Sequence, residues 1–424
     1  MPIPPERRYG VYLYELRVGT LVQRGDETRF NFSDDYFDDP ARPVLGLRFE
    51  QHRDQPYRAA LRLPPWFSNL LPEGPLRQWV ARDRDVSSDR EMELLAQLGA
   101  DLPGAIRVAP VDGDSEESIW PEDEVIHRPQ PPGAAGSSSP WRFSFAGVAL
   151  KFSMLRHGDR LSVPAADERG DWIVKFPDHR FPDVPLNEYA MMTLAARAGI
   201  EIPEVTLVHR DQLDGLPSVM WPNRESVAYA VRRFDRTEKR SLVHIEDFAQ
   251  VLDRWATEPH HGSGKYASSF ATVLLTAYRG HDEDSLVEAT RRIAFNAVIG
   301  NGDAHLKNWS LIYRDRRRPK LSPAYDLVAT APYRPSDEPE DFGLKFNGSR
   351  RFQDVTLSGF ERLAFRIRNR LGTFEADLPE LAADVAKRVH AAWPEVRTML
   401  ASNPRLQTQI DAWIGQMTNQ LQRR

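Results

Sequence analysis

The chain has 424 residues, and its 41% hydrophobic and 28% charged content is ordinary for a soluble globular protein. This chain is longer than a typical single domain, so its length predicts two or three domains. The absence of cysteine excludes disulfides, thiolate metal sites and cysteine nucleophiles. A formal net charge of −5 provides no overall attraction to nucleic acid or to an anionic membrane. No apolar run approaches the roughly 18 residues of a membrane-spanning helix, and the chain start lacks a secretory signal, so we expect a cytoplasmic protein.

Residues 1–110 predict a small α+β subdomain, named here the N-terminal subdomain. Strand-like runs such as YGVYLYELRVGTLVQ come first, and helical patterns follow in PEGPLRQWVARD and SDREMELLAQLGA. Residues 111–140 are rich in acidic residues, Pro, Gly and Ser, which is typical of a linker or a flexible loop.

Residues 141–236 return to strand-like runs and predict a second, β-rich lobe. One helix is expected within it, in LNEYAMMTLAARAG, with Gly199 as its terminator. Residues 237–424 read as mostly helical, including IEDFAQVLDRWA at 245–256, and predict a helical third part. The fold class predicted from these patterns is α+β.

The segment GNGDAHLKNWSLIY, followed by LSPAYDLVAT, carries the strongest chemical signal. Between Asn308 and Asp326, a strand-like WSLIY, a polar turn and a returning segment predict a hairpin that brings these two residues together. Amide and carboxylate oxygens are ligands that Mg²⁺ prefers. A third acid, Asp303, would orient an attacking hydroxyl group and accept its proton.

The spacing of these residues matches that of protein kinases, which carry a catalytic Asp, an Asn five positions later and a metal-binding Asp after a hairpin. Here Asn308 lies five positions after Asp303, and Asp326 follows eighteen positions later. The alternative is an ordinary polar loop in which Asn301, Asp303 and Asn308 cap turns.

Several ordered segments resemble the HipA-type serine/threonine kinases, which are toxins of bacterial toxin–antitoxin pairs. Besides the catalytic segments, they are FSNLLPEGPLRQWV (67–80), SFAGVALK (144–151), WIVKFP (172–177), NEYAMMTLAARAGIEIPEV (187–205), VRRFDR (231–236) and EDFAQVL (246–252). The resemblance implies a bilobal protein-kinase-like fold: an extra N-terminal subdomain, a kinase N-lobe at 141–236 and a helical C-lobe at 237–424 that holds the catalytic hairpin.

The resemblance places Ser144, Gly147 and Lys151 in register with the phosphate-binding loop of the family, SxAGxQxK, although Ala149 replaces its Gln. It also implies that Ser144 is a regulatory phosphosite, whose autophosphorylation switches the enzyme off. From the residues alone, this small-residue segment suits either a phosphate loop or a plain hairpin turn.

Lys175 lies in an apolar strand, where a charged group needs a partner or a ligand. We expect it to bind the α/β-phosphates and to pair with Glu188, as in kinases; a lysine that reaches solvent is the alternative. Phe234 and Asp235 resemble the hinge that reads adenine, with Phe234 at the contact and Asp235 near the ribose.

Two further residues lie inside the catalytic segment. Lys307 could neutralise charge on the transferred phosphoryl group, and His305 is expected to brace the loop.

The resemblance implies an ATP- and Mg²⁺-dependent toxin that arrests growth by phosphorylating a translation component such as an aminoacyl-tRNA synthetase. Its partner would be a HipB-like DNA-binding antitoxin, and DNA would be contacted only through that antitoxin. Two other functions stay open: a small-molecule or lipid kinase on the same scaffold, and a catalytically weak repressor partner. No residue in the chain selects the substrate.

Overall fold

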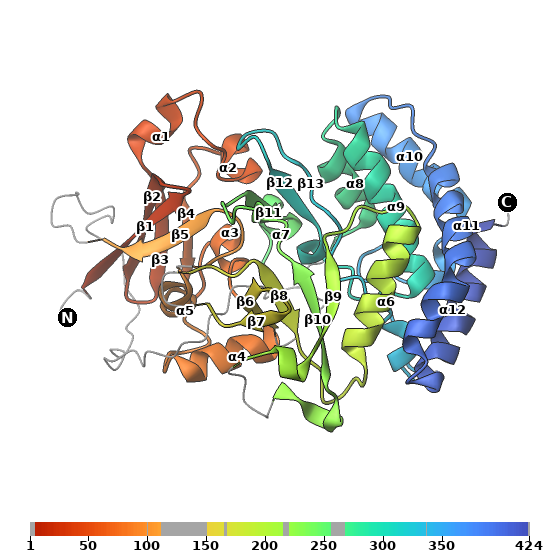
Figure 1. The fold of residues 1–424 in the computed structure, drawn as a ribbon. Helices are drawn as coiled ribbons and strands as arrows, with labels where there is room; N and C mark the ends of the chain where they lie inside the picture. Colours follow the sequence, from red (N-terminus) through yellow and green to blue (C-terminus); the bar gives the residue numbers. More distant parts are fainter. Residues whose placement is uncertain are drawn as a thin grey trace.

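The computed structural model describes residues 5–99, 101–111, 151–164, 168–214, 220–255, 268–335 and 337–422. Within these residues there are two five-stranded sheets, a three-stranded sheet and a block of helices; the N-terminal sheet and the C-terminal helices lie at opposite sides of the view, with the other two sheets between them (Figure 1). The predicted α+β, kinase-like class is confirmed. Most of the predicted linker at 111–140 lies outside the described residues.

The N-terminal subdomain is built on an antiparallel sheet with the strand order β4-β3-β2-β1-β5. Its strands are β1 (Glu6–Leu13), β2 (Leu16–Arg24), β3 (Glu27–Phe32), β4 (Tyr57–Ala60) and β5 (Ile106–Pro110). Its helices are α1 (Asp34–Asp38), α2 (Leu47–Gln51), α3 (Pro65–Ser68), α4 (Gly74–Asp83) and α5 (Glu91–Leu98). The order of strands first and helices between and after them agrees with the predicted α+β subdomain.

The second sheet forms the β-rich lobe, with the strand order β7-β6-β8-β10-β9. Its strands are β6 (Lys151–His157), β7 (Arg160–Ser162), β8 (Trp172–Lys175), β9 (Val205–His209) and β10 (Val227–Arg232). The helix α6 (Val184–Arg197) lies between β8 and β9 in the chain. Gly199 follows it with a φ of 82°, a left-handed conformation that glycine adopts without steric cost, so the predicted helix terminator is confirmed.

The third sheet contains β11 (His244–Asp247), β12 (Ser310–Tyr313) and β13 (Lys320–Leu321). Strands β12 and β13 pair antiparallel, which confirms the predicted hairpin. The predicted helix at 245–256 is wrong at its start, because Ile245 pairs with Ile312 in the sheet and α7 covers only Phe248–Val251. Pairing with a distant strand outweighs the local helical pattern.

The C-terminal helices pack against one another, in agreement with the predicted helical lobe. They are α8 (Phe270–Tyr278), α9 (Glu283–Ile299), α10 (Leu357–Leu371), α11 (Leu378–Val396) and α12 (Pro404–Gln422). In Figure 1, α11 lies beside α9 and α12, and all three contact one another. Of the helices in the described ranges, none is both long and apolar enough to cross a membrane.

The β-rich lobe is packed on both faces of its sheet. Along β10, Ala228 and Ala230 belong to the hydrophobic core of the N-terminal subdomain, while Tyr229 and Val231 belong to the core of the C-terminal helices. This alternation follows from the two-residue repeat of a strand. The sheet of the predicted kinase N-lobe is therefore packed between the N-terminal subdomain and the helical lobe.

The end of α9 generates a stability prediction. Gly300 has a φ of 70°, and a Cβ atom there would lie 2.8 Å from the Trp413 ring. Gly158 has a φ of 60° with nothing within 4 Å of such an atom. Both Gly→Ala changes cost about 1 kcal/mol through the left-handed backbone, and Gly300→Ala adds about 1–3 kcal/mol of overpacking. Urea unfolding should show the larger loss for Gly300→Ala; equal losses would contradict this packing.

Candidate active site

A cleft lies where the three parts of the chain meet, and six of the predicted site residues line it: Lys151, Lys175, Phe234, Asp235, Lys307 and Asp326. Its lining residues are Asn69, Pro103, Lys151, Ile173, Lys175, Val231, Arg232, Arg233, Phe234, Asp235, Ile245, Asp247, Gln250, Lys307, Ser310, Tyr325 and Asp326. No site role was predicted for Asn69 and Pro103, which come from the N-terminal subdomain, or for Asp247 and Tyr325. For Asn69 the available signal was the family-like segment 67–80, and for Asp247 it was the helix-capping pattern Asp-x-x-Gln.

Two lysines enter the cleft from neighbouring strands. Lys151 on β6 and Lys175 on β8 are direct partners in the sheet, so their side chains share one face. Both are buried, with 6% and 8% of their surface exposed. Two buried like charges side by side are unfavourable unless anions compensate them.

Lys175 has two such anions. Its ammonium donates hydrogen bonds to Glu188 on α6 and to Asp326 beyond the catalytic hairpin, so the predicted Lys175–Glu188 contact is present. Burial acts to lower the pKa of Lys175, but the two carboxylates outweigh it and raise that pKa above its ordinary value. Burial likewise acts to raise the pKa of Asp326, yet Lys175 and Lys151 hold it well below its usual range. Lys175 and Asp326 therefore both stay charged at neutral pH.

Lys151 differs from its neighbour. Among the described residues, no carboxylate or other acceptor makes a hydrogen bond or an ion pair with its ammonium. Burial lowers the pKa of Lys151, and the more distant Asp326 opposes that shift only in part. A buried cation that faces a cleft without its own anion is suited to an anionic ligand.

The catalytic segment folds into a loop that follows α9 and includes the short 3₁₀ turn Leu306–Asn308. Asn308 Nδ2 donates to the carbonyl oxygen of Asp303 at 2.7 Å, which ties the two predicted residues together. His305 Nε2 lies 3.6 Å from Asp303 Oδ1, in agreement with a bracing role for this histidine. The Asp303 side chain is 58% exposed, so its carboxylate is accessible from solvent.

Asp326 is brought to the same loop. It lines a small cavity together with Asn308 and Asn301. Asn301 Nδ2 donates to the carbonyl oxygen of Asp326 at 3.3 Å, and Asp326 has a φ of 55°. A left-handed aspartate costs about 1–3 kcal/mol and persists only where its surroundings impose it, which is common at functional sites.

The oxygen donors fit a hard divalent cation. Asn308 uses its amide nitrogen on Asp303, which leaves the amide oxygen as its other polar end, and Asp326 supplies a carboxylate held in its ionised form. One carboxylate and one amide oxygen suit Mg²⁺, which usually keeps waters and phosphate oxygens as its remaining ligands.

The contacts of Lys307 differ from those expected for a residue on the transferred phosphoryl group. Its ammonium donates to the Asn69 carbonyl oxygen at 2.7 Å and lies 3.3 Å from Glu73 Oε1. The Asp247 carboxylate lies 4.0 Å away. Although Lys307 lines the cleft, its charge is thus directed to the N-terminal subdomain, and the phosphoryl role stays a prediction.

The two predicted hinge residues both line the cleft, but their side chains make different contacts. The Phe234 ring lies 5.5 Å from the Tyr325 ring and lines the cleft. The Asp235 carboxylate instead accepts hydrogen bonds from Arg233, Arg236 and the Gly104 backbone, and its pKa is lowered to about 2 because the two arginines outweigh burial. Both oxygens of Asp235 are engaged in this network, which opposes the predicted contact with ribose. Arg–Asp–Arg pairing across the hinge was not foreseen from VRRFDR.

The predicted phosphate-loop residues Ser144 and Gly147 lie outside the described residues, and of that segment only Lys151 is described. Their roles stay predictions.

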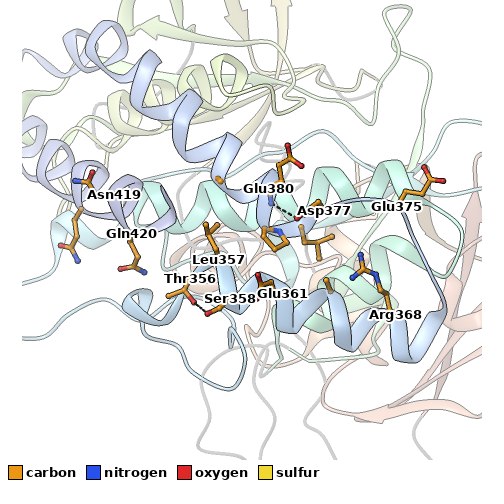
Figure 2. A pocket seen from close by; sticks show the side chains of 15 residues that line it. Thr356, Leu357, Ser358, Glu361, Arg368, Glu375, Asp377, Glu380, Asn419 and Gln420 are labelled. Carbon is orange, nitrogen blue, oxygen red and sulfur yellow. Dashed lines mark hydrogen bonds between the residues drawn. The ribbon is translucent and has the colours of Figure 1, made fainter. Parts of the chain in front are cut away.

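A larger hollow than the cleft lies among α10, α11 and α12. Figure 2 shows its polar lining, where the Asp377 carboxylate caps α11 by accepting from the Glu380 backbone at 3.0 Å. It contains none of the predicted site residues and no buried lysine. The volume of a hollow therefore does not identify the active site. The charged residues of the cleft, including Lys151, Lys175 and Asp326, make it the better candidate.

Comparison with known proteins agrees with this geometry. Residues 143–393 match the family of HipA-like C-terminal domains, and residues 9–109 match the HipA N-terminal domain family. The chain belongs to the HipA family. This HipA-family chain is therefore an enzyme of the serine/threonine protein kinase class, and kinase chemistry implies ATP as the phosphate donor.

Two relatives and one solved structure illustrate the likeness. The HipA-family chain is 39% identical over 412 residues to Y4dM of Sinorhizobium fredii, covering 95% of each chain. It is 26% identical over 359 residues to the serine/threonine-protein kinase toxin HipA of Shewanella oneidensis, covering 78% of this chain and 76% of the relative. A complex of Shewanella oneidensis MR-1 HipA, HipB and operator DNA contains a chain with a TM-score of 0.68 at 21% identity, covering 98% of this chain and 96% of that one. At this identity the structural likeness establishes the fold.

The two buried lysines should respond oppositely to removal of their charge. Lys151→Met replaces a buried cation that lacks an ion-pair partner among the described residues, so the free energy of unfolding should stay constant or rise. Lys175→Met leaves Glu188 and Asp326 without their cation, and the free energy of unfolding should fall by about 3–5 kcal/mol. Chemical denaturation of the two variants checks this contrast, and a large loss for Lys151→Met would show that its ammonium is already paired.

Proposed function

We propose that this HipA-family kinase transfers the γ-phosphoryl group of Mg·ATP to a serine or threonine of a protein that serves translation, and that it acts as the toxin of a toxin–antitoxin pair. The observation that carries the nucleotide assignment is Lys151, whose buried ammonium faces the cleft beside the Lys175–Asp326 pair. Triphosphate oxygens would supply the missing negative charge there.

In this proposal each residue of the site has a separate task. Lys151 and Lys175 bind phosphate oxygens, and Phe234 packs against the base at the hinge. Asp303 accepts a hydrogen bond from the substrate hydroxyl group and takes its proton while that oxygen bonds to the γ-phosphorus. The bond from the γ-phosphorus to the bridging oxygen breaks, and ADP leaves with the electron pair.

Asn308 and Asp326 are proposed to hold the magnesium ion, which would neutralise phosphate charge during the transfer. The strained backbone of Asp326 and its contacts with Lys175 and Asn301 support this role, because they keep the carboxylate beside Asn308 before any ligand binds.

A HipB-like DNA-binding antitoxin is the proposed partner, and an aminoacyl-tRNA synthetase is the proposed type of target. The partner rests on the complex of the Shewanella oneidensis chain with HipB and operator DNA. The target rests on the family resemblance alone. Ser144 is proposed as an autophosphorylation site, since a phosphate there would repel the triphosphate beside Lys151.

Asp303→Ala should lower the phosphoryl-transfer rate by about 10²–10⁴-fold, which is the usual contribution of a general base. Its side chain is 58% exposed, so the melting temperature should stay near that of the unmodified protein. Asp337→Ala, at another exposed acid, is the matched control. An Asp303→Ala variant that retains full activity would remove Asp303 from the mechanism.

Lys151→Met should weaken Mg·ATP binding about tenfold or more, because a hydrogen bond to a charged group contributes about 1.5–3 kcal/mol. Isothermal titration calorimetry measures this loss, with Lys239→Met as a matched exposed lysine that should leave affinity unchanged. Equal affinity of Lys151→Met and the unmodified protein would refute the phosphate assignment.

Phosphoproteomics after brief expression, comparing the unmodified protein with Asp303→Ala, tests the function as a whole. New phosphoserine or phosphothreonine on a translation protein supports the proposal. Phosphorylation of a metabolite or lipid, with no protein labelled, contradicts it.

A further inference from the structure

The side chain of Lys307 leaves the catalytic loop and enters the N-terminal subdomain. Its ammonium donates to the backbone carbonyl of Asn69 at 2.7 Å and lies 3.3 Å from the Glu73 carboxylate, while Asp247 is at 4.0 Å. Lys307 is only 6% exposed, and the Glu73 side chain is 11% exposed. A charge pair at this depth is screened less by solvent than a surface pair, so its loss has a larger effect.

The turn that receives Lys307 is itself held in place. Asn69 follows α3 and donates from its side-chain amide to the Pro65 carbonyl at 2.8 Å and to the Arg254 carbonyl at 2.7 Å. Gln250, on α7, donates to the Trp66 carbonyl at 3.1 Å. Hydrogen bonds within α3 and to the segment around α7 therefore hold the Asn69 turn that accepts from Lys307.

The backbone of Lys307 lies next to the proposed catalytic residues. Its backbone carbonyl accepts a hydrogen bond from the Tyr325 hydroxyl at 2.7 Å, and Tyr325 directly precedes Asp326. The next residue in the loop is Asn308, which is hydrogen-bonded to Asp303. A shift of Lys307 would consequently move both proposed magnesium ligands and the proposed base together.

We propose that Glu73 and the Asn69 turn are positioning residues of the kinase reaction: by holding Lys307, the N-terminal subdomain sets the catalytic loop in its working geometry. The inference rests on the proposed roles of Asp303, Asn308 and Asp326. Without the Glu73 charge, the other carboxylate that the described residues place within ion-pair distance of the Lys307 ammonium is that of Asp247 in the C-lobe, at 4.0 Å. The ammonium then moves toward it, and the loop moves with it.

The test is Glu73→Gln in the full-length protein, with kcat and KM for ATP measured separately. We expect kcat to fall about 10- to 100-fold, as small misplacements of catalytic groups do. KM for ATP should rise by a smaller factor than kcat falls, because Lys151, Lys175 and the hinge are untouched and only the proposed magnesium ligands shift. Partial unfolding would lower the active fraction but leave the measured kcat per folded, nucleotide-binding molecule unchanged, so active sites are titrated in each preparation.

A double mutant separates positioning from direct contact with phosphate. If Glu73 acts through Lys307, Glu73→Gln should add little to the loss caused by Lys307→Met, since both break one contact. Lys307→Arg, which retains the charge, should recover part of the activity. If Lys307 instead contacts the phosphoryl group directly, Lys307→Met loses activity while Glu73→Gln does not, and the inference is overturned.

Control variants distinguish a failure of this inference from a failure of the proposed function. Glu15→Gln, at an exposed glutamate of the same subdomain, should leave kcat and KM unchanged. If Glu73→Gln fails to fold, Glu73→Asp keeps the charge but shortens its reach, and a normal kcat in that variant counts against positioning. Absence of phosphoryl transfer by the unmodified protein would refute the proposed function, whereas normal transfer by Glu73→Gln would refute this inference alone.

Discussion

The buried ion pairs of Lys175 hold the catalytic half of the molecule together. This ammonium joins Glu188, 13 residues away on α6, to Asp326, 151 residues away beyond the hairpin. Lys175 and Glu188 are both buried, and an isolated charge at either position would lose its hydration without compensation. The sheet, the helix and the loop must therefore assemble together. The same contact explains how Asp326 is kept ionised and in a left-handed backbone conformation before a ligand arrives.

The N-terminal subdomain packs against the β-rich lobe and contacts residues of the cleft. Its hydrophobic core continues into one face of the β-rich lobe, so the sheet under the cleft has no exposed side there. It also contacts both ends of the cleft. Asp101 pairs with Arg233 and Arg236 at the hinge, and the Asn69 turn accepts the Lys307 ammonium at the catalytic loop. A ligand or a partner that shifts this subdomain has a direct route to the geometry of the site.

Much of the site could be predicted because its signals are local. The five-residue interval from Asp303 to Asn308, the strand-turn-strand pattern before Asp326 and the lysine in the apolar strand β8 each follow from short segments. The hairpin and the Lys175–Glu188 contact were found where expected. The predicted helical start of the segment 245–256 was wrong, because pairing with the distant strand β12 decided it. The ribose contact of Asp235 stays a prediction, and the hydrogen bonds that Asp235 accepts from Arg233 and Arg236 could not be read from the local segment.

The sequence by itself determined which chemistry is available: two oxygen donors for a cation, a free carboxylate and basic residues for phosphates, in the order and spacing of a kinase. It also determined where strands, turns and helices alternate, since hydrophobic periodicity is a property of neighbouring residues. Only the tertiary structure decided how charges are shared. It directs Lys307 to the N-terminal subdomain, closes Asp235 within arginines and leaves Lys151 facing the cleft. These pairings depend on which charged groups lie close together in the folded chain and on how deeply they are buried. The electrostatic energy of such a pair cannot be read from any short segment.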